Sequence, residues 1–91
     1  MIKKYLKKPI PVTAIQVIHD DELEDKFWEE VNEFFGNENP FFVVNSDGTF
    51  MLETLEGDMT GRWGDYVLRG PMNDFWIVRK NIFEETYKEV K

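Results

Sequence analysis

The chain has 91 residues, of which 42% are hydrophobic and 15% aromatic, and it contains no cysteine. This apolar content excludes a disordered chain, and the length allows one domain, residues 1–91. Without cysteine there is no disulfide bond, no thiolate nucleophile and no sulfur-ligated zinc. The net charge of −7 makes nucleic acid and anionic membranes unfavourable partners.

A first strand is predicted for residues 12–18, VTAIQVI, which are rich in β-branched residues. We expect it to pair with the rest of the sheet, since a lone strand leaves its backbone groups unsatisfied. We expect the basic start of the chain not to be a signal peptide, because Pro9 and Pro11 stand where a continuous apolar core would have to lie. No apolar run reaches the roughly 20 residues of a membrane span, so we expect a cytoplasmic protein.

An amphipathic helix is predicted next. Asp20 or Asp21 can cap it, with Glu24 in a capping-box position. Apolar residues then recur at steps of three or four along one face, which consists of Leu23, Phe27, Val31 and Phe34 and is widened by Trp28 and Phe35. Gly36 ends the helix, because glycine readily adopts the left-handed conformation of a helix C-terminus.

Short strands separated by turns are predicted for the remainder. We expect strands over residues 41–44, 49–55, 58–62 (the weakest), 66–69 and 75–79, and a helix over residues 82–90. Asp47-Gly48 and Gly64-Asp65 mark turns, and Asn81 can cap the last helix. The fold class is therefore α+β: a curled, antiparallel, partial-barrel-like sheet of about five short strands, with one amphipathic helix packed on it and a short C-terminal helix.

The second half of the chain, LETLEGDMTGRWGDYVLRGPMNDFWIVRKNIFEETYKEV, resembles small proteins of phages and prophages of bacteria. Its most specific blocks are GDY at 64–66 and IFEETY at 82–87, and the KKPIPVTAIQ strand followed by an acidic helix is typical of the same proteins. Trp63 stands where that family usually has proline, and residues 72–74 and 78–81 also depart from its pattern. The family has no established activity, so the resemblance implies a phage origin and a shared fold.

Two surfaces are candidates for binding a protein. The predicted helix and the residues before it set eight acids against Lys26, namely Asp20, Asp21, Glu22, Glu24, Asp25, Glu29, Glu30 and Glu33. This face either mimics phosphates or docks on a basic host protein, with Glu29 and Glu30 as the candidate contacts, or it is simply solvated. The second surface is Trp63 with Asp65 and Tyr66. A tryptophan in a turn is either a binding anchor or a lid that closes a small core.

A third candidate is a basic cluster formed by Arg62, Arg69, Arg79 and Lys80. Its arginines, with Tyr66 or Trp76 stacking on a base, could hold a phosphorylated metabolite or nucleotide. The alternative is that the arginines pair across strands with acidic side chains, namely Glu53, Glu56 or Asp74.

Metal and catalytic motifs are missing from the sequence. His19 with Asp20, Asp21 and Glu22 has no recognised ligand spacing, and the chain has no nucleophile elbow, Ser-His-Asp order or phosphate loop. We therefore expect no metal, no cofactor and no enzymatic activity.

The leading functional hypothesis is a phage or prophage accessory protein. It would act in the cytoplasm of the host bacterium by binding a host protein, and would inhibit a host defence or another host process. The alternatives are a protein that sequesters a small phosphorylated ligand, and a virion or assembly component. Exposed strand edges in so small a domain also favour a homodimer.

Overall fold

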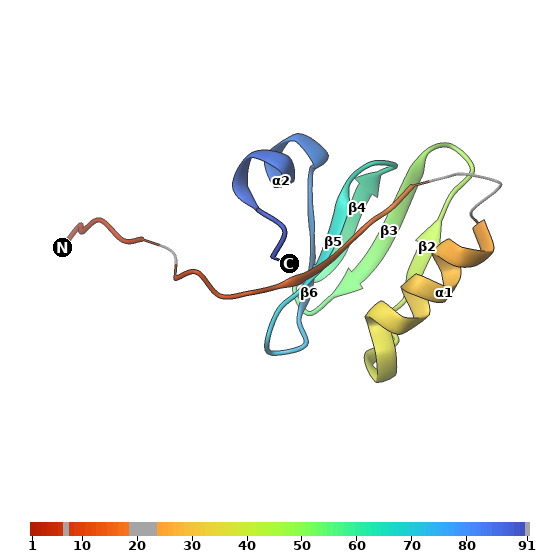
Figure 1. Cartoon of the computed structure of the whole chain (residues 1–91), viewed down its shortest axis with the longest axis horizontal. Coiled ribbons are helices and arrows are strands. Elements are labelled where there is room, and N and C mark those ends of the chain that lie inside the picture. The colour runs from red at the N-terminus through yellow and green to blue at the C-terminus, as the bar shows by residue number, and fades with distance from the viewer. Residues whose placement is uncertain (7, 19–23, 91) are drawn as a thin grey trace.

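The computed structural model of the protein describes residues 1–6, 8–18 and 24–90. Two helices and six strands lie in these residues (Figure 1). The strands are β1 (Thr13–Gln16), β2 (Phe42–Val44), β3 (Thr49–Thr54), β4 (Gly57–Arg62), β5 (Tyr66–Arg69) and β6 (Phe75–Val78). The helices are α1 (Glu24–Phe35) and α2 (Lys80–Thr86), and a short 3-10 turn, η2 (Gly36–Glu38), follows α1. The α+β class predicted from the sequence is confirmed.

The strands form two antiparallel sheets, in the orders β1-β5-β6 and β2-β3-β4. The predicted single curled sheet of about five strands is therefore wrong. The chain turns between the sheets at residues 62–65, where the Asp65 N–H donates to the Arg62 carbonyl over 2.9 Å. After this turn β5 pairs with β1, as the Ile15–Val67 register shows, rather than with β4. The segment predicted as the weakest strand is β4, which pairs with β3 along its whole length.

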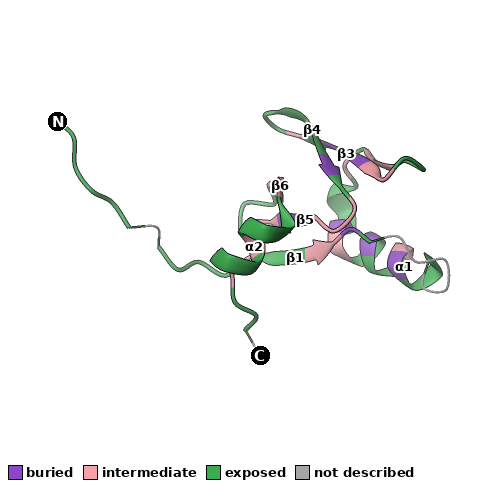
Figure 2. Ribbon diagram, turned by 90° about the horizontal axis from the view of Figure 1, so that it is seen from above, coloured by how far each residue is buried: buried purple, intermediate pink, exposed green. Residues whose placement is uncertain are grey.

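Helix α1 packs an aromatic face against both sheets. Phe27, Val31 and Phe35 are its buried residues, one turn apart, and the Phe35 ring lies 5.3 Å from that of Phe42 and 5.1 Å from that of Phe75. One core joins the helix to the two sheets, and Figure 2 shows its buried segments. Its buried members are Val17, Phe27, Val31, Phe35, Phe50, Leu52 and Val67.

Gly36 ends α1 with a φ of 56°, in the left-handed region that the sequence predicts for it. The predicted caps Asp20 and Asp21, and the predicted core residue Leu23, lie outside the described residues.

The hairpin between β2 and β3 contains the predicted Asp47-Gly48 turn. Asp47 Oδ1 accepts hydrogen bonds from the Thr49 hydroxyl, at 2.6 Å, and from the Thr49 N–H, at 3.0 Å. Both hydrogen bonds lower the pKa of the Asp47 carboxyl, because both favour its charged form. The bond from the Thr49 hydroxyl has the larger effect on this pKa, and the bond from the Thr49 N–H the smaller one.

Helix α2 is attached to the first sheet by an aromatic stack. The ring of Tyr66 lies 3.8 Å from that of Phe83, with an interplanar angle of 17°, and Phe83 stacks in turn on Tyr87 at 4.9 Å. The two sequence blocks GDY and IFEETY therefore contact each other. The prediction that Asn81 caps α2 is wrong. The helix begins at Lys80, so Asn81 lies inside it.

The described residues before β1, 1–6 and 8–12, extend away from the body as an arm (Figure 1). Its large apolar side chains are exposed, with Ile2 at 104%, Tyr5 at 85% and Leu6 at 97% of full exposure. Neither described helix has the length and apolar character to cross a membrane.

Candidate functional site: a cleft between the two sheets

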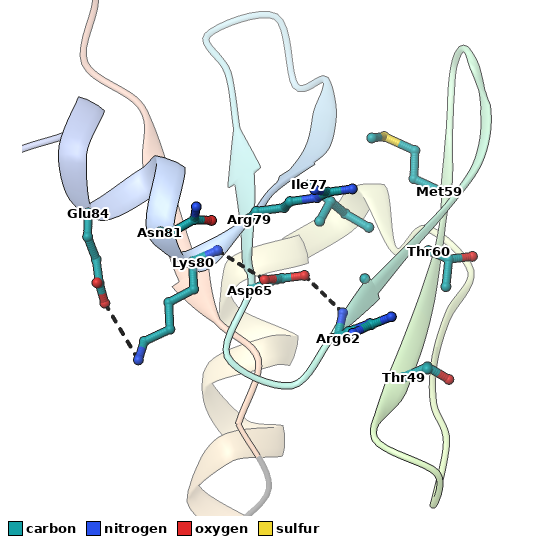
Figure 3. A pocket seen from close by; sticks show the side chains of 11 residues that line it. Thr49, Met59, Thr60, Arg62, Asp65, Ile77, Arg79, Lys80, Asn81 and Glu84 are labelled. Atoms are coloured by element: carbon teal, nitrogen blue, oxygen red, sulfur yellow. Dashed lines mark hydrogen bonds and ion pairs between the residues drawn. The ribbon is translucent and has the colours of Figure 1, made fainter.

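A cleft of about 890 Å³ opens between β4 and the junction of β6 with α2 (Figure 3). Met59 and Arg62 line it from β4, Ile77 from β6, and Arg79 and Lys80 from the start of α2. The cleft thus has one wall from each sheet, and it forms only because the turn at residues 62–65 sets the sheets beside each other.

Asp65 joins the two walls of the cleft. Its Oδ2 accepts a hydrogen bond from the Arg62 N–H at 2.9 Å, and its Oδ1 accepts one from the Lys80 N–H at 3.0 Å. Its main-chain carbonyl accepts the Val17 N–H at 2.9 Å. Gly64 makes this arrangement possible with a φ of 104°, a value that other residues rarely adopt. Asp65 is therefore a remote cap for α2 that also ties β1 and β4 together.

The cationic groups of the cleft are Arg62 and Arg79, which are both exposed. Figure 3 shows the Arg79 side chain extending from the end of β6 towards β4. Neither guanidinium group has a hydrogen bond or ion pair with another residue in the described part of the chain. Lys80 turns away towards Glu84, with its Nζ 3.9 Å from Oε1. The two arginines are thus the groups that an anion entering the cleft would meet.

The structure separates Arg69 from the other predicted ligand-binding residues. Its Nη1 donates to the Phe34 carbonyl at 2.9 Å, its Nη2 donates to Asn73 Oδ1 at 2.7 Å, and its guanidinium lies 5.7 Å from the centre of the Phe75 ring. Arg69 therefore satisfies a carbonyl at the C-terminal end of α1 and holds that helix on the sheet. Tyr66, also in the predicted set, stacks on Phe83 outside the cleft.

The predicted pairing of arginines with acids across strands is wrong where the register tests it. Arg62 lies opposite Thr49, and Arg69 lies opposite Phe75. Glu53, one of the expected acidic partners, lies opposite Asp58.

Trp63 is half-buried and packs against the core. The main-chain N–H of Trp63 donates to the Gly48 carbonyl at 2.9 Å, so this bond fixes the β2–β3 turn to the turn that follows β4. Its ring forms one wall of a second hollow, about 220 Å³ in volume, with Trp28 and Val44. This packing agrees with the interpretation of Trp63 as a lid on a small core.

The remaining predicted site residues lie apart from the cleft. Glu29 and Glu30 are exposed on α1, away from both sheets. The metal hypothesis placed on His19, Asp20, Asp21 and Glu22 falls outside the described residues, and within the described part of the chain no three His, Asp or Glu side chains cluster as a metal site.

Comparison with models of known protein families, with curated proteins and with solved structures gave no match. The resemblance to small phage and prophage proteins therefore stays a prediction from the sequence. The fold and the site together define an α+β protein of two three-stranded sheets with a cationic cleft between them.

Proposed function

We propose that the protein binds a small phosphorylated molecule, such as a nucleotide, in the cleft between its sheets. The observation that supports this is the meeting of Arg62 from one sheet and Arg79 from the other on one cleft. A guanidinium group binds phosphate oxygens through paired, charge-assisted hydrogen bonds. Two such groups facing a common space can bind one phosphate, or two linked phosphates, from opposite sides.

The size and lining of the cleft support a small ligand rather than a polymer. Its volume of about 890 Å³ falls within the roughly 300–1,000 Å³ of small-molecule sites. Met59 and Ile77 add apolar surface for the sugar or base of a nucleotide. A nucleic acid would be opposed by the net charge of −7, whereas a small anion needs only the local contacts.

We propose binding without catalysis. The carboxylate of Asp65, which lines the cleft with the two arginines, already accepts two backbone N–H groups. The described residues that line the cleft include no histidine and no cysteine. A protein of this kind would act by lowering the free concentration of its ligand, which suits a phage or prophage protein in the cytoplasm of a host bacterium.

Saturating nucleotide is expected to raise the melting temperature of the protein. A ligand present at 100 times its dissociation constant adds about 2.7 kcal/mol to the free energy of unfolding. Differential scanning fluorimetry against a panel of nucleoside mono-, di- and triphosphates measures the effect. The double substitution Arg62→Gln/Arg79→Gln is expected to abolish it, while Arg62→Gln/Lys88→Gln, with the same net charge, retains part of it. No shift with any nucleotide would contradict the proposal.

A second candidate, the binding of a host protein, is supported by the exposed acidic face of α1. Lys26 is the only basic residue of the helix, and the exposed acids are Glu24, Asp25, Glu29, Glu30 and Glu33. Such a face suits a basic partner through complementary charge.

Charge reversal on that face is expected to abolish capture of a host protein. In pull-downs from the host bacterium, Glu29→Lys/Glu30→Lys should lose the partner because attraction becomes repulsion. The matched control Glu85→Lys/Glu89→Lys changes the same number of charges elsewhere and should keep it. Equal capture by both variants would exclude α1 as the docking surface.

A further inference from the structure

We propose that two copies of the chain pair through the outer edges of their β1 strands, each placing its N-terminal arm on the body of the other. Strand β1 ends one sheet, in the order β1-β5-β6, so within the described residues only one of its edges has a neighbouring strand. A free edge presents a row of backbone donors and acceptors that a second strand can satisfy. This surface is independent of the proposed ligand cleft.

The hydrogen bonding of β1 identifies the groups on the free edge. The Val17 N–H donates to the Asp65 carbonyl, and Ile15 lies opposite Val67 in the register with β5. Because successive residues of an antiparallel strand turn their backbone groups to opposite edges, the N–H and C=O of Ala14 and Gln16 point away from β5. Ala14 is exposed and small, so another backbone can approach it closely.

The prolines before β1 leave this edge intact. Pro9 and Pro11 precede the strand, which begins at Thr13, so neither removes an N–H group from β1 itself. The Ile10 N–H donates to the Lys8 carbonyl at 2.8 Å, so the chain makes a local turn at Pro9 before the strand begins.

When the β1 strands of two copies pair antiparallel, each copy contributes the same surface. This is what the interface of a twofold dimer requires. If the pair is centred near Ile15, each arm runs on past the end of the other copy's β1 towards the start of its α1. The start of α1 exposes Glu24 and Asp25, whereas the arm exposes Lys3 and Lys4.

The charges of the arm and the body are complementary. The first eight residues hold four of the eleven basic residues and none of the 18 acidic ones. The arm also exposes Ile2, Tyr5 and Leu6 almost completely, and these apolar side chains are stabilised when docking removes them from water. A second copy is the favoured occupant, because the acidic body carried by each arm opposes approach to an anionic membrane or a nucleic acid.

The test is the mass of the protein in solution. Sedimentation equilibrium of the wild type should give about twice the 10.9 kDa of one chain. Ala14→Pro removes an outward N–H that the monomer does not use, so it should raise the dissociation constant of the dimer by at least about tenfold. Ala14→Val keeps the N–H and should preserve the dimer. Circular dichroism checks that both variants retain the wild-type fold.

A second pair of variants tests the arm without touching a strand. Lys3→Gln/Lys4→Gln should weaken the dimer several-fold and make it less sensitive to salt, whereas Lys26→Gln/Lys88→Gln should not. A wild type that sediments as a single chain at a few hundred micromolar would overturn the proposal. So would a dimer that Ala14→Pro leaves unchanged. Binding of a monomer to phosphatidylserine vesicles or to duplex DNA through Lys3 and Lys4 would assign the arm to that partner instead.

Discussion

Replacement of Gly61 by valine is expected to lower the free energy of unfolding by about 2–3 kcal/mol. Gly61 is buried on β4, and a Cβ built on it would lie 2.8 Å from Cε1 of Phe50. Phe50 is fully buried between the sheets and cannot move aside without disturbing the core. The backbone of Gly61 is not in the left-handed region, so the loss comes from this contact and not from backbone strain.

Urea unfolding of four variants measures the Gly61 effect: Gly61→Val, Thr60→Val, Phe50→Leu and the double mutant Gly61→Val/Phe50→Leu. Thr60→Val introduces valine at the exposed neighbouring position and should change stability little. Phe50→Leu removes ring atoms that the new side chain would meet, so in a double-mutant cycle it should cost less in the Gly61→Val background than in the wild type. If the losses of unfolding free energy caused by Gly61→Val and Phe50→Leu simply added in the double mutant, the proposed contact between position 61 and Phe50 would be contradicted.

Replacement of Asp65 by alanine is expected to lower the free energy of unfolding by about 2–3 kcal/mol, because the substitution removes the acceptor of two backbone N–H groups at once. The N–H groups of Arg62 and Lys80 donate to its two carboxylate oxygens. The start of α2 and the end of β4 would both lose their attachment to this turn.

Asp65→Asn separates shape from hydrogen bonding. An amide keeps the volume but turns an NH2 group towards one of the two donors, so we expect most of the loss to remain. Asp58→Ala, at an exposed acid on β4, serves as the control and should be nearly neutral. The role given to Asp65 would be wrong if Asp65→Ala and Asp58→Ala had equal stability in chemical denaturation.

Local patterns predicted the elements of the fold well. The spacing of Phe27, Val31 and Phe34 identified α1, although Phe35 rather than Phe34 is its third buried residue, and Gly36 identified its end. Strand β4 looked weak because its sequence, GDMTGR, offers little apolar surface; it forms because every residue pairs with β3.

The division into two sheets had no local signal. It depends on Gly64 and Asp65 bonding to Val17, a residue far away in the sequence. The cap of α2 was missed for the same reason: Asp65 lies 15 residues before the N–H of Lys80 that it accepts, whereas a search for caps considers only neighbouring residues.

The candidate site was predicted in part. Arg62 and Arg79 were named together, and the structure brings them to one cleft. Arg69 was grouped with them because it is close in sequence. It lies three residues after Tyr66 on β5, however, and three residues of extended strand span about 10 Å. The register then pairs Tyr66 with Val78, next to the cleft, and Arg69 with Phe75 at the far end of the hairpin.

Titration of the isotope-labelled protein with inorganic pyrophosphate tests the central claim, that the cleft binds phosphate groups. Backbone amide spectra should show saturable shifts at Arg62, Arg79 and Lys80, which line the cleft. The amides of Glu29 and Glu30 on α1 should not move. Absence of saturable shifts around Arg62 and Arg79 at millimolar pyrophosphate, or equal shifts in Arg62→Gln/Arg79→Gln, would contradict the account.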